Sequence, residues 1–335
     1  MSDNQAHPPA FALRAAWRWQ QALIGVVIGA ALLALTAERA SFGAMLEPLR
    51  RMDAGWAALA LIAYGLDLGL RVIRWRLLFV KVAPLPLATF ARALIVGYGL
   101  NILLPARLGE LARIEYLKLK TETRRSAAIP AILVERAMDG LFVLGALAAG
   151  LAIAHAAGAG SPLLVGLIGA GAATVGLLVA ASFALRRVPE AILRRLPARA
   201  TESLARAHGS LAAMAPRRLA GAALLTVAIY AAEALALAAI VAAIGTTATI
   251  ALLLTLLGAA SLSTLLPTAP GFLGSSQLAY ALGVELVGRS PALGAAAATA
   301  VQVVLFAPVV VAALVLVLAP QRRRRPPAAP AEPAA

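Results

Sequence analysis

Long apolar runs, separated by short basic segments, dominate this chain and leave few folds open to it. A helix of about 20 apolar residues is long enough to cross the hydrocarbon core of a bilayer. The runs that reach or approach this length are 20–36, 56–70, 129–154, 162–185, 219–244 and 291–319. The chain is 61% hydrophobic and 13% charged, which is more apolar surface than a globule of 335 residues buries. We therefore predict an all-α polytopic membrane protein with about six full spans.

Two further apolar runs, 87–104 and 248–266, each end at a proline that a glycine follows closely. If 87–104 were a simple span, the basic segments 118–125 and 186–218 would lie outside, although cytoplasmic loops carry the excess of Lys and Arg. A chain that enters from the cytoplasm, breaks at Pro105 and returns keeps both segments inside. We predict a re-entrant helical hairpin here, whose short, charged return arm must face protein or a wet cavity.

The second broken run repeats the first. Residues 100–111 align without a gap on residues 262–273, at an offset of 162, and share L-x-x-L-L-P-x-x-x-G-x-L. The charges make the first hairpin enter from the cytoplasm and the second from outside, as in transporters whose broken helices form a site near the midplane. We predict an inverted repeat with halves at about 20–154 and 162–319; proline-kinked ordinary helices are the alternative. The backbone positions assigned to the hairpins are Pro105, Gly109, Pro267, Pro270, Gly271, Gly274 and Gln277.

The positive charges predict the orientation. Of the 30 Lys and Arg residues, 22 fall in segments that this topology places in the cytoplasm, Arg71 and Arg74 among them, and four fall outside. Both termini are therefore predicted to be cytoplasmic, with 1–19 as an N-terminal segment and 320–335 as a basic, Pro- and Ala-rich tail around the transmembrane domain 20–319. The net charge of +15 comes in short clusters typical of cytoplasmic loops, so we expect no nucleic-acid partner.

Charged residues gather in the stretch 97–140, which is otherwise suited to lipid. A charge at membrane depth costs about 3 kcal/mol or more unless it is paired or wetted. Arginine offers a planar fork for phosphate, so the arginines are predicted to hold an anionic headgroup and the carboxylates to hold the arginines or an ammonium. The alternative is a structural ion-pair network that fastens the hairpin to the bundle. The candidate substrate-binding residues are Asn101, Arg107, Glu110, Arg113, Glu135, Arg136 and Asp139.

Charged residues outside this stretch are fewer. Asp67, Glu233 and Arg92 stand alone in apolar runs, where they either line the cavity or reach water at an interface.

Several chemistries lack the residues they need. The chain has no cysteine and three scattered histidines, so we expect no thiol chemistry, metal centre or cofactor. No phosphate-binding G-x-x-x-x-G-K-[ST] sequence is present, which argues against direct use of ATP. No histidine, cysteine or serine with suitable neighbours stands in the charged stretch, except Ser126 at its cytoplasmic edge. We therefore predict that the chain is not an enzyme.

Three motifs in the first half of the chain are R-x-x-R-W-R-x-L-F at 71–79, N-x-L-L-P-A-R-L-G-E-L-A-R at 101–113 and V-E-R-A-M-D-G at 134–140. Together they resemble the membrane domain of lysylphosphatidylglycerol synthases and the related flippase-like proteins of bacterial inner membranes. The segment P-G-F-L-G-S-S-Q at 270–277 resembles the second glycine-rich hairpin of that family. The resemblance covers roughly 54–319, without the soluble synthase domain. Two positions depart from the family pattern, since Gln277 and Gln302 stand where many relatives have glutamate and arginine.

The resemblance implies a multi-pass protein of the bacterial inner membrane that translocates a lipid or lipid-linked molecule. The candidate substrates are an anionic or aminoacylated phospholipid, a glycolipid and a polyprenyl-phosphate carrier. One alternative is a membrane-embedded accessory or scaffold subunit with a lipid- or envelope-biosynthesis enzyme as its partner. The other is an intramembrane transferase.

Overall fold

The computed structural model describes residues 26–38, 42–79, 85–104, 108–120, 125–156, 176, 214–264 and 269–318. These residues form helices and turns, with no β-strand among them. In chain order the labelled elements are α2 (Phe42–Arg50), α3 (Ala54–Leu78), α4 (Leu87–Leu103), α5 (Gly109–Lys120), α6 (Arg125–Ala156), α10 (Pro216–Ala243), α11 (Ile250–Ser263), η2 (Pro270–Phe272), α12 (Ser275–Glu285), α13 (Pro291–Val301), η3 (Gln302–Phe306) and α14 (Ala307–Leu318). Pro105, Arg107 and Pro267, all singled out from the sequence, lie outside the described residues.

Four helices in the described part of the chain are long and apolar enough to cross a membrane, and they coincide with four of the six predicted crossings. They are Ala54–Leu78, Ala128–Ala154, Pro216–Ala243 and Pro291–Leu318. A shorter apolar helix, Val26–Glu38, overlaps the run at 20–36. The predicted crossing at 162–185 lies outside the described residues.

The offset of 162 residues, first seen in a short motif, also relates the bounds of the helices in the two halves. Ala54 begins α3 and Pro216, 162 positions later, begins α10. Ala156 ends α6 and Leu318, again 162 positions later, ends α14. Between these limits α4 and α5 in the first half correspond in order to α11 and α12 in the second.

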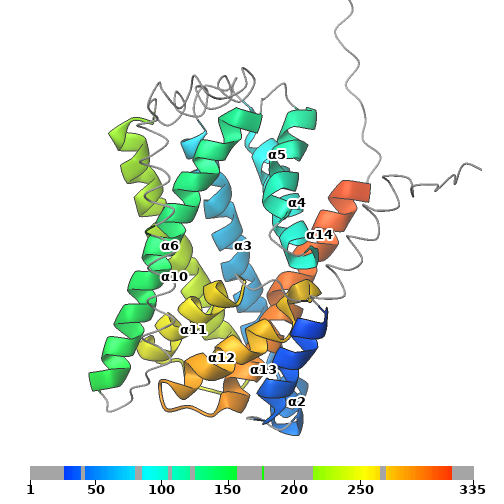
Figure 1. The fold of residues 1–335 in the computed structure, drawn as a ribbon, viewed down its shortest axis with the longest axis vertical. Helices are drawn as coiled ribbons and strands as arrows, with labels where there is room; N and C mark the ends of the chain where they lie inside the picture. Colours follow the sequence, from blue (N-terminus) through cyan, green and yellow to red (C-terminus); the bar gives the residue numbers. More distant parts are fainter. Residues whose placement is uncertain are drawn as a thin grey trace, which may run out of the picture.

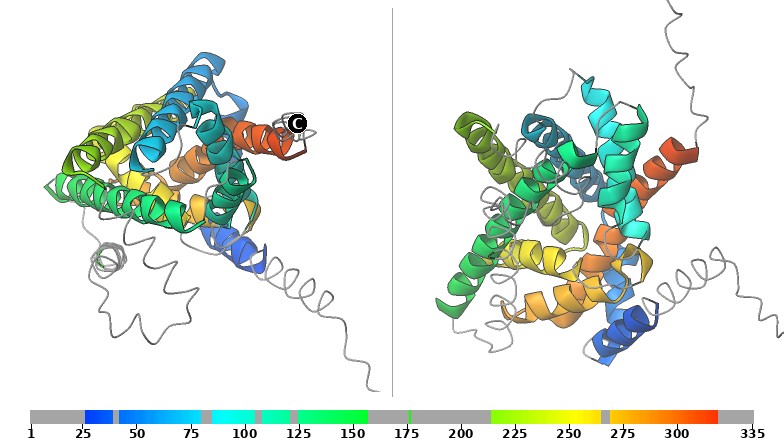
Figure 2. Two further views of the ribbon diagram at one scale, coloured as in Figure 1. Left: turned by 90° about the horizontal axis from the view of Figure 1, so that it is seen from above. Right: turned by 45° about the horizontal axis from the view of Figure 1, so that its top comes forward.

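The two corresponding helices α3 and α10 pack along each other in opposite directions (Figures 1 and 2). At one end the backbone N–H of Asp53 donates to the carbonyl of Ala243 at 2.9 Å. At the other end Arg218 donates to the carbonyl of Leu77 at 3.4 Å. The start of each helix therefore lies beside the end of the other.

Each half also packs its last long helix against the shorter helices of the other half. Helix α6 packs on α11, and α14 packs on α4. In Figure 1, α4 and α5 lie in the upper part of the molecule, whereas α11 and α12 lie in the lower part.

The central contacts are made by small and aliphatic side chains that are fully buried, as expected where membrane helices approach closely. They include Ala60, Ile229, Ala236, Leu252 and Leu256.

Helices α4 and α5 form a close pair because glycine stands at their contact. Helix α4 ends at Leu103, and Leu104 is extended, as the residue before a proline prefers. Helix α5 then begins at Gly109 and packs on α4. A Cβ atom on Gly109 would collide with the carbonyl oxygen of Gly97 and with the backbone of Asn101. The contact thus brings the start of α5 against the last turns of α4.

Candidate functional site

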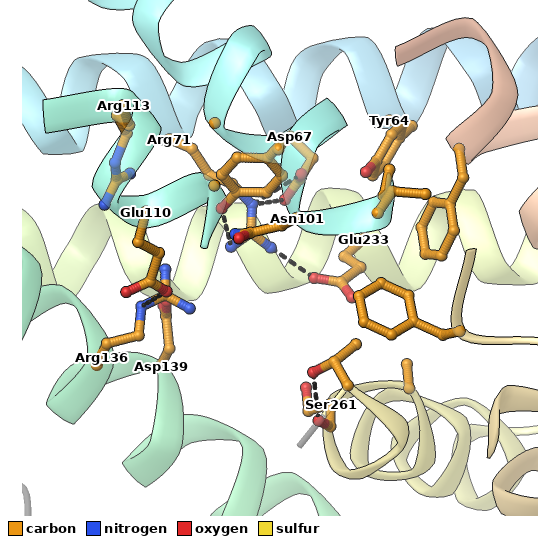
Figure 3. A pocket seen from close by; sticks show the side chains of 18 of the residues that line it. Tyr64, Asp67, Arg71, Asn101, Glu110, Arg113, Arg136, Asp139, Glu233 and Ser261 are labelled. Atoms are coloured by element: carbon orange, nitrogen blue, oxygen red, sulfur yellow. Dashed lines mark hydrogen bonds and ion pairs between the residues drawn. The ribbon is translucent and has the colours of Figure 1, made fainter. Parts of the chain in front are cut away.

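A cavity of about 170 Å³ lies between the two halves, lined from α3, α4, α5, α6, α10, α11, η2 and η3 (Figure 3). A volume of about 10–15 Å³ already holds one water molecule, so this cavity has room for a hydrated polar group. Its charged lining residues are Asp67, Arg71, Glu110, Arg113, Arg136, Asp139 and Glu233.

Arg71 connects the two halves through one guanidinium group. Its Nε donates to both carboxylate oxygens of Asp67, one turn earlier on α3, at 3.0 and 2.9 Å. Nη1 donates to the hydroxyl of Tyr98 at 3.3 Å, and Nη2 donates to Oε2 of Glu233 on α10 at 2.7 Å. The guanidinium carbon also lies 5.8 and 5.6 Å from the ring centroids of Tyr98 and Tyr230. All three nitrogens of Arg71 are therefore engaged.

A second group of charges is sealed from solvent. Arg74 on α3 donates to both carboxylate oxygens of Asp139 on α6, at 2.6 and 3.1 Å, and to Thr226 on α10 at 2.8 Å. Arg113 on α5 donates two hydrogen bonds to Glu135, at 3.3 and 3.2 Å. The side chains of Arg74, Glu135 and Arg113 are 0%, 1% and 2% exposed. Each of these buried charges thus has an oppositely charged partner, as a charge at membrane depth requires.

Arg136 and Glu110 form the more open edge of the same cluster. Arg136 pairs with Glu135 at 2.7 Å, with Asp139 at 3.3 Å and with Glu110 at 3.5 Å. The side chains of Arg136 and Glu110 are each 22% exposed. Both residues line the cavity, where Figure 3 draws them across from Arg71 and Glu233.

The charges of the cluster nearly cancel. Four arginines, at positions 71, 74, 113 and 136, are paired with five carboxylates, at positions 67, 110, 135, 139 and 233. The formal net charge of these nine residues is therefore −1. Each of these arginines has a carboxylate partner, as in a resting site whose carboxylates hold the arginines or in a permanent structural network.

Most of the residues predicted from the sequence meet here. Of the seven candidates, Asn101, Glu110, Arg113, Arg136 and Asp139 line the cavity. Glu135 is buried behind them, between Arg113 and Arg74, and Arg107 lies outside the described residues. Asp67 and Glu233, for which a cavity or an interface was left open, both line the cavity, whereas Arg92 is exposed.

The placement of Arg71 and Arg74 in a cytoplasmic segment was wrong. Helix α3 continues to Leu78, eight residues beyond the predicted end of that crossing, and buries both side chains. The signal was present in the sequence, because Asp67 and Arg71 are four apart and so share a helix face. Sequence reasoning also missed the cavity-lining tyrosines Tyr64, Tyr98 and Tyr230, for which aromatic residues in apolar runs give no specific signal.

The second half carries a neutral counterpart. Gln277 accepts from the backbone N–H of Gly274 at 2.8 Å and donates to Oε1 of Gln302 at 2.7 Å. Gln302 in turn donates to the carbonyl of Gly271 at 2.9 Å. The two residues that depart from the family pattern thus bond to each other. They tie the start of α12 to η3, a π-helical segment of the kind found at functional sites.

The chain matches a known protein family over most of its length. Residues 22–323 match the family model described as the lysylphosphatidylglycerol synthase TM region. The chain belongs to this family. No curated protein and no solved structure matches it significantly. As a member of the lysylphosphatidylglycerol synthase TM-region family with several membrane-length apolar helices, the chain is a multi-pass membrane protein of a lipid-related family.

Proposed function

We propose that the chain translocates a lipid or lipid-linked molecule, whose polar headgroup passes through the charged cavity while its tails stay in the bilayer. A flippase must remove the cost of taking a charged headgroup through hydrocarbon. The observation that carries the proposal is a cavity of about 170 Å³ between the two halves, which is lined by both signs of charge.

The topology proposed for this activity is an inverted repeat. Helices α4–α5 and α11–α12 act as re-entrant hairpins that enter from opposite faces of the bilayer. The antiparallel packing of α3 on α10 and the constant offset of 162 residues support this arrangement. The excess of Lys and Arg supports cytoplasmic termini in a bacterial inner membrane.

The charged residues divide by exposure into two proposed roles. Arg74, Arg113 and Glu135 are at most 2% exposed and hold α3, α5 and α6 together. Arg136 and Glu110 at 22%, with Glu233 at 20%, face the cavity and meet the headgroup. Candidate substrates remain the anionic or aminoacylated phospholipids, glycolipids and polyprenyl-phosphate carriers.

An accessory or scaffold subunit is the second candidate, and one observation favours it. All four arginines of the cluster already have a carboxylate partner, so their charges are paired without a ligand. In that role the ion pairs would only fix the helices. An intramembrane transferase has less support, because the hydroxyl residues Ser261 and Thr264 that line the cavity have no histidine beside them in the lining.

The test uses the purified protein in vesicles of phosphatidylcholine and phosphatidylglycerol that contain a fluorescent phosphatidylglycerol. We expect the wild-type protein to move the labelled lipid between leaflets, measured by quenching with a membrane-impermeant reductant. Arg136→Gln should slow transfer by about tenfold to a hundredfold, because a charge-assisted hydrogen bond contributes about 1.5–3 kcal/mol. Its melting temperature should stay near that of the wild type.

Arg51→Gln is the matched control, because Arg51 is 82% exposed and lies outside the cavity. It should leave transfer unchanged. A well-folded Arg136→Gln protein with undiminished transfer would contradict the proposal, and a variant that simply fails to fold would favour the scaffold. Mass spectrometry of the lipid that co-purifies with the protein then identifies the substrate.

A further inference from the structure

The ion pair between Arg71 and Glu233 joins equivalent positions of the two halves. The residues are 162 positions apart, which is the same offset that relates α3 to α10. Because these helices run antiparallel and pack together, the pair bridges the two halves directly at the cavity. Any step that changes this pair therefore acts on both halves at once.

The two carboxylates that share Arg71 are held very differently. Asp67 is 0% exposed and lies on the same helix as Arg71. Both of its carboxylate oxygens accept a hydrogen bond from Nε of Arg71, at 3.0 and 2.9 Å. Glu233 is 20% exposed, and only one of its carboxylate oxygens accepts a hydrogen bond from Arg71, from Nη2 at 2.7 Å. Glu233 is thus the exchangeable partner of Arg71, and Asp67 is the fixed one.

Arg71 would keep its position if Glu233 released it. Asp67 fixes its Nε, the Tyr98 hydroxyl accepts from its Nη1, and the rings of Tyr98 and Tyr230 lie against its guanidinium. A planar guanidinium with one free N–H edge is a suitable receptor for a phosphate oxygen. The receptor is therefore preformed, and the carboxylate of Glu233 occupies it in this structure.

The charge of this triad favours an exchange that involves a proton. Two carboxylates and one guanidinium carry a formal charge of −1, which is costly in an apolar environment. A phosphate entering beside an ionised Glu233 would raise that charge to −2. If Glu233 first binds a proton, the triad becomes neutral, and a singly charged phosphodiester then restores −1. The loaded site thus has the same charge as the empty one.

We propose that Glu233 is a proton-binding site whose protonation releases Arg71 to bind an anionic phosphate headgroup. The Glu233 carboxylate takes up one proton and becomes a carboxyl group, and its ion pair with Nη2 breaks. Nη2 then donates to a phosphate oxygen of the headgroup. On release the phosphate leaves, the carboxyl group loses its proton, and the ion pair forms again. This inference rests on the proposed function and adds that proton and anionic headgroup occupy the cavity together.

The groups facing Glu233 from the surrounding helices are consistent with this assignment. The groups that line the cavity with Glu233 or interact with it electrostatically are Tyr64, Asp67 and Arg71 on α3, Tyr98 on α4, Glu110 and Arg113 on α5, Arg136 and Asp139 on α6, Tyr230 on α10 and Tyr280 on α12. The two aspartates among them are each held by two hydrogen bonds from an arginine. The negative charges of the two aspartates oppose a further negative charge at Glu233, which accepts fewer hydrogen bonds than either aspartate.

Calorimetry tests the exchange. The binding of a soluble short-chain phosphatidylglycerol to the purified protein is measured from about pH 5 to about pH 9. Because binding favours the protonated form of Glu233, wild-type affinity should rise as pH falls, by at most roughly tenfold per pH unit. In buffers of different ionisation heat, about one proton should be taken up per lipid at the high end of the range. Inorganic phosphate is titrated in parallel, and equal binding with the same proton uptake would support the exchange but assign the site to phosphate itself.

Glu233→Gln mimics the protonated state, so it should bind the lipid at high pH about as tightly as the wild type does at low pH, without proton uptake. Glu47→Gln, at an exposed position outside the cavity, should keep the wild-type pH dependence. Loss of proton uptake in Glu110→Gln, with uptake retained in Glu233→Gln, would overturn the assignment. The wild-type proton count tests the exchange even if a variant does not fold.

The experiment separates this inference from the function on which it rests. Wild-type binding and transfer that do not change with pH, with no proton uptake, would overturn the exchange and leave the translocator intact. Absence of lipid binding and of transfer at every pH would overturn both.

Discussion

Arg74 shows what a single charged residue needs in order to lie inside a membrane helix. Its side chain is fully buried, and its guanidinium meets Asp139 through two hydrogen bonds and Thr226 through a third. Glu135 lies 3.6 Å away. A buried ion pair of this kind often stabilises a fold no more than apolar residues of similar volume would. Removing one partner is nevertheless costly, because it leaves a buried charge without a counter-charge.

We expect Arg74→Met to destabilise the protein by about 3–5 kcal/mol, because it leaves the buried Asp139 and Glu135 with one counter-charge fewer. Unfolding in mixed micelles measures the loss. Arg51→Met is the control, since Arg51 is 82% exposed and a surface ion pair contributes about 0–1 kcal/mol. Equal effects of the two substitutions would show that the buried network does not stabilise the fold.

At the scale of elements, close helix pairs place the cavity. Gly109 lets α5 begin against the backbone of α4, which brings Glu110 and Arg113 to the same wall as Asn101. In the second half Gly274 has a φ of +84° before α12, and a Cβ atom there would collide with the carbonyl oxygen of Gly29. Glycine is the residue that tolerates both the close approach and this left-handed backbone.

Gly109→Ala should therefore separate α4 from α5 and lower the stability by about 1–3 kcal/mol, the usual cost of overpacking. The added methyl group would meet backbone atoms, which cannot rotate away. The melting temperature in detergent gives the measurement. Gly145→Ala on α6, where nothing lies within 4 Å of the new Cβ atom, should have no such effect. If Gly109→Ala melted with the wild type, the pair would be looser than the structure describes.

For the whole molecule, the asymmetric distribution of Lys and Arg and the antiparallel packing of the two halves together predict how the helices are oriented in the membrane. Moving Arg71 and Arg74 into α3 lowers the cytoplasmic count from 22 to 20 Lys and Arg residues, against four outside. The asymmetry thus survives the correction. It predicts that α10 starts at the cytoplasmic face and ends at the external face.

Single cysteines test this orientation without background, because the chain has none of its own. Ala215 and Ala248 are both exposed and lie at opposite ends of α10. In intact cells, a membrane-impermeant maleimide should label Ala248→Cys at once and Ala215→Cys only after the membrane is opened. Labelling of Ala215→Cys from outside would reverse the topology, and with it the side from which each proposed hairpin enters.

The sequence by itself determined the helical class, four membrane-length helices, the 162-residue offset and most of the charged residues that line the cavity. These depend on local properties, namely the length of apolar runs, the positions of proline and glycine, and the cost of charge in lipid. Asn101 and Glu110, for example, are polar residues in an apolar stretch, and this pattern by itself identifies them as candidate site residues.

Only the tertiary structure decided which charges meet. Arg74 pairs with Asp139, 65 positions away, and Arg71 with Glu233, 162 positions away. No local spacing specifies such partners, because they depend on how α3, α6 and α10 pack. For the same reason the sequence placed Arg71 and Arg74 in a basic loop. Their burial became understandable once the carboxylates of two other helices were seen to surround them.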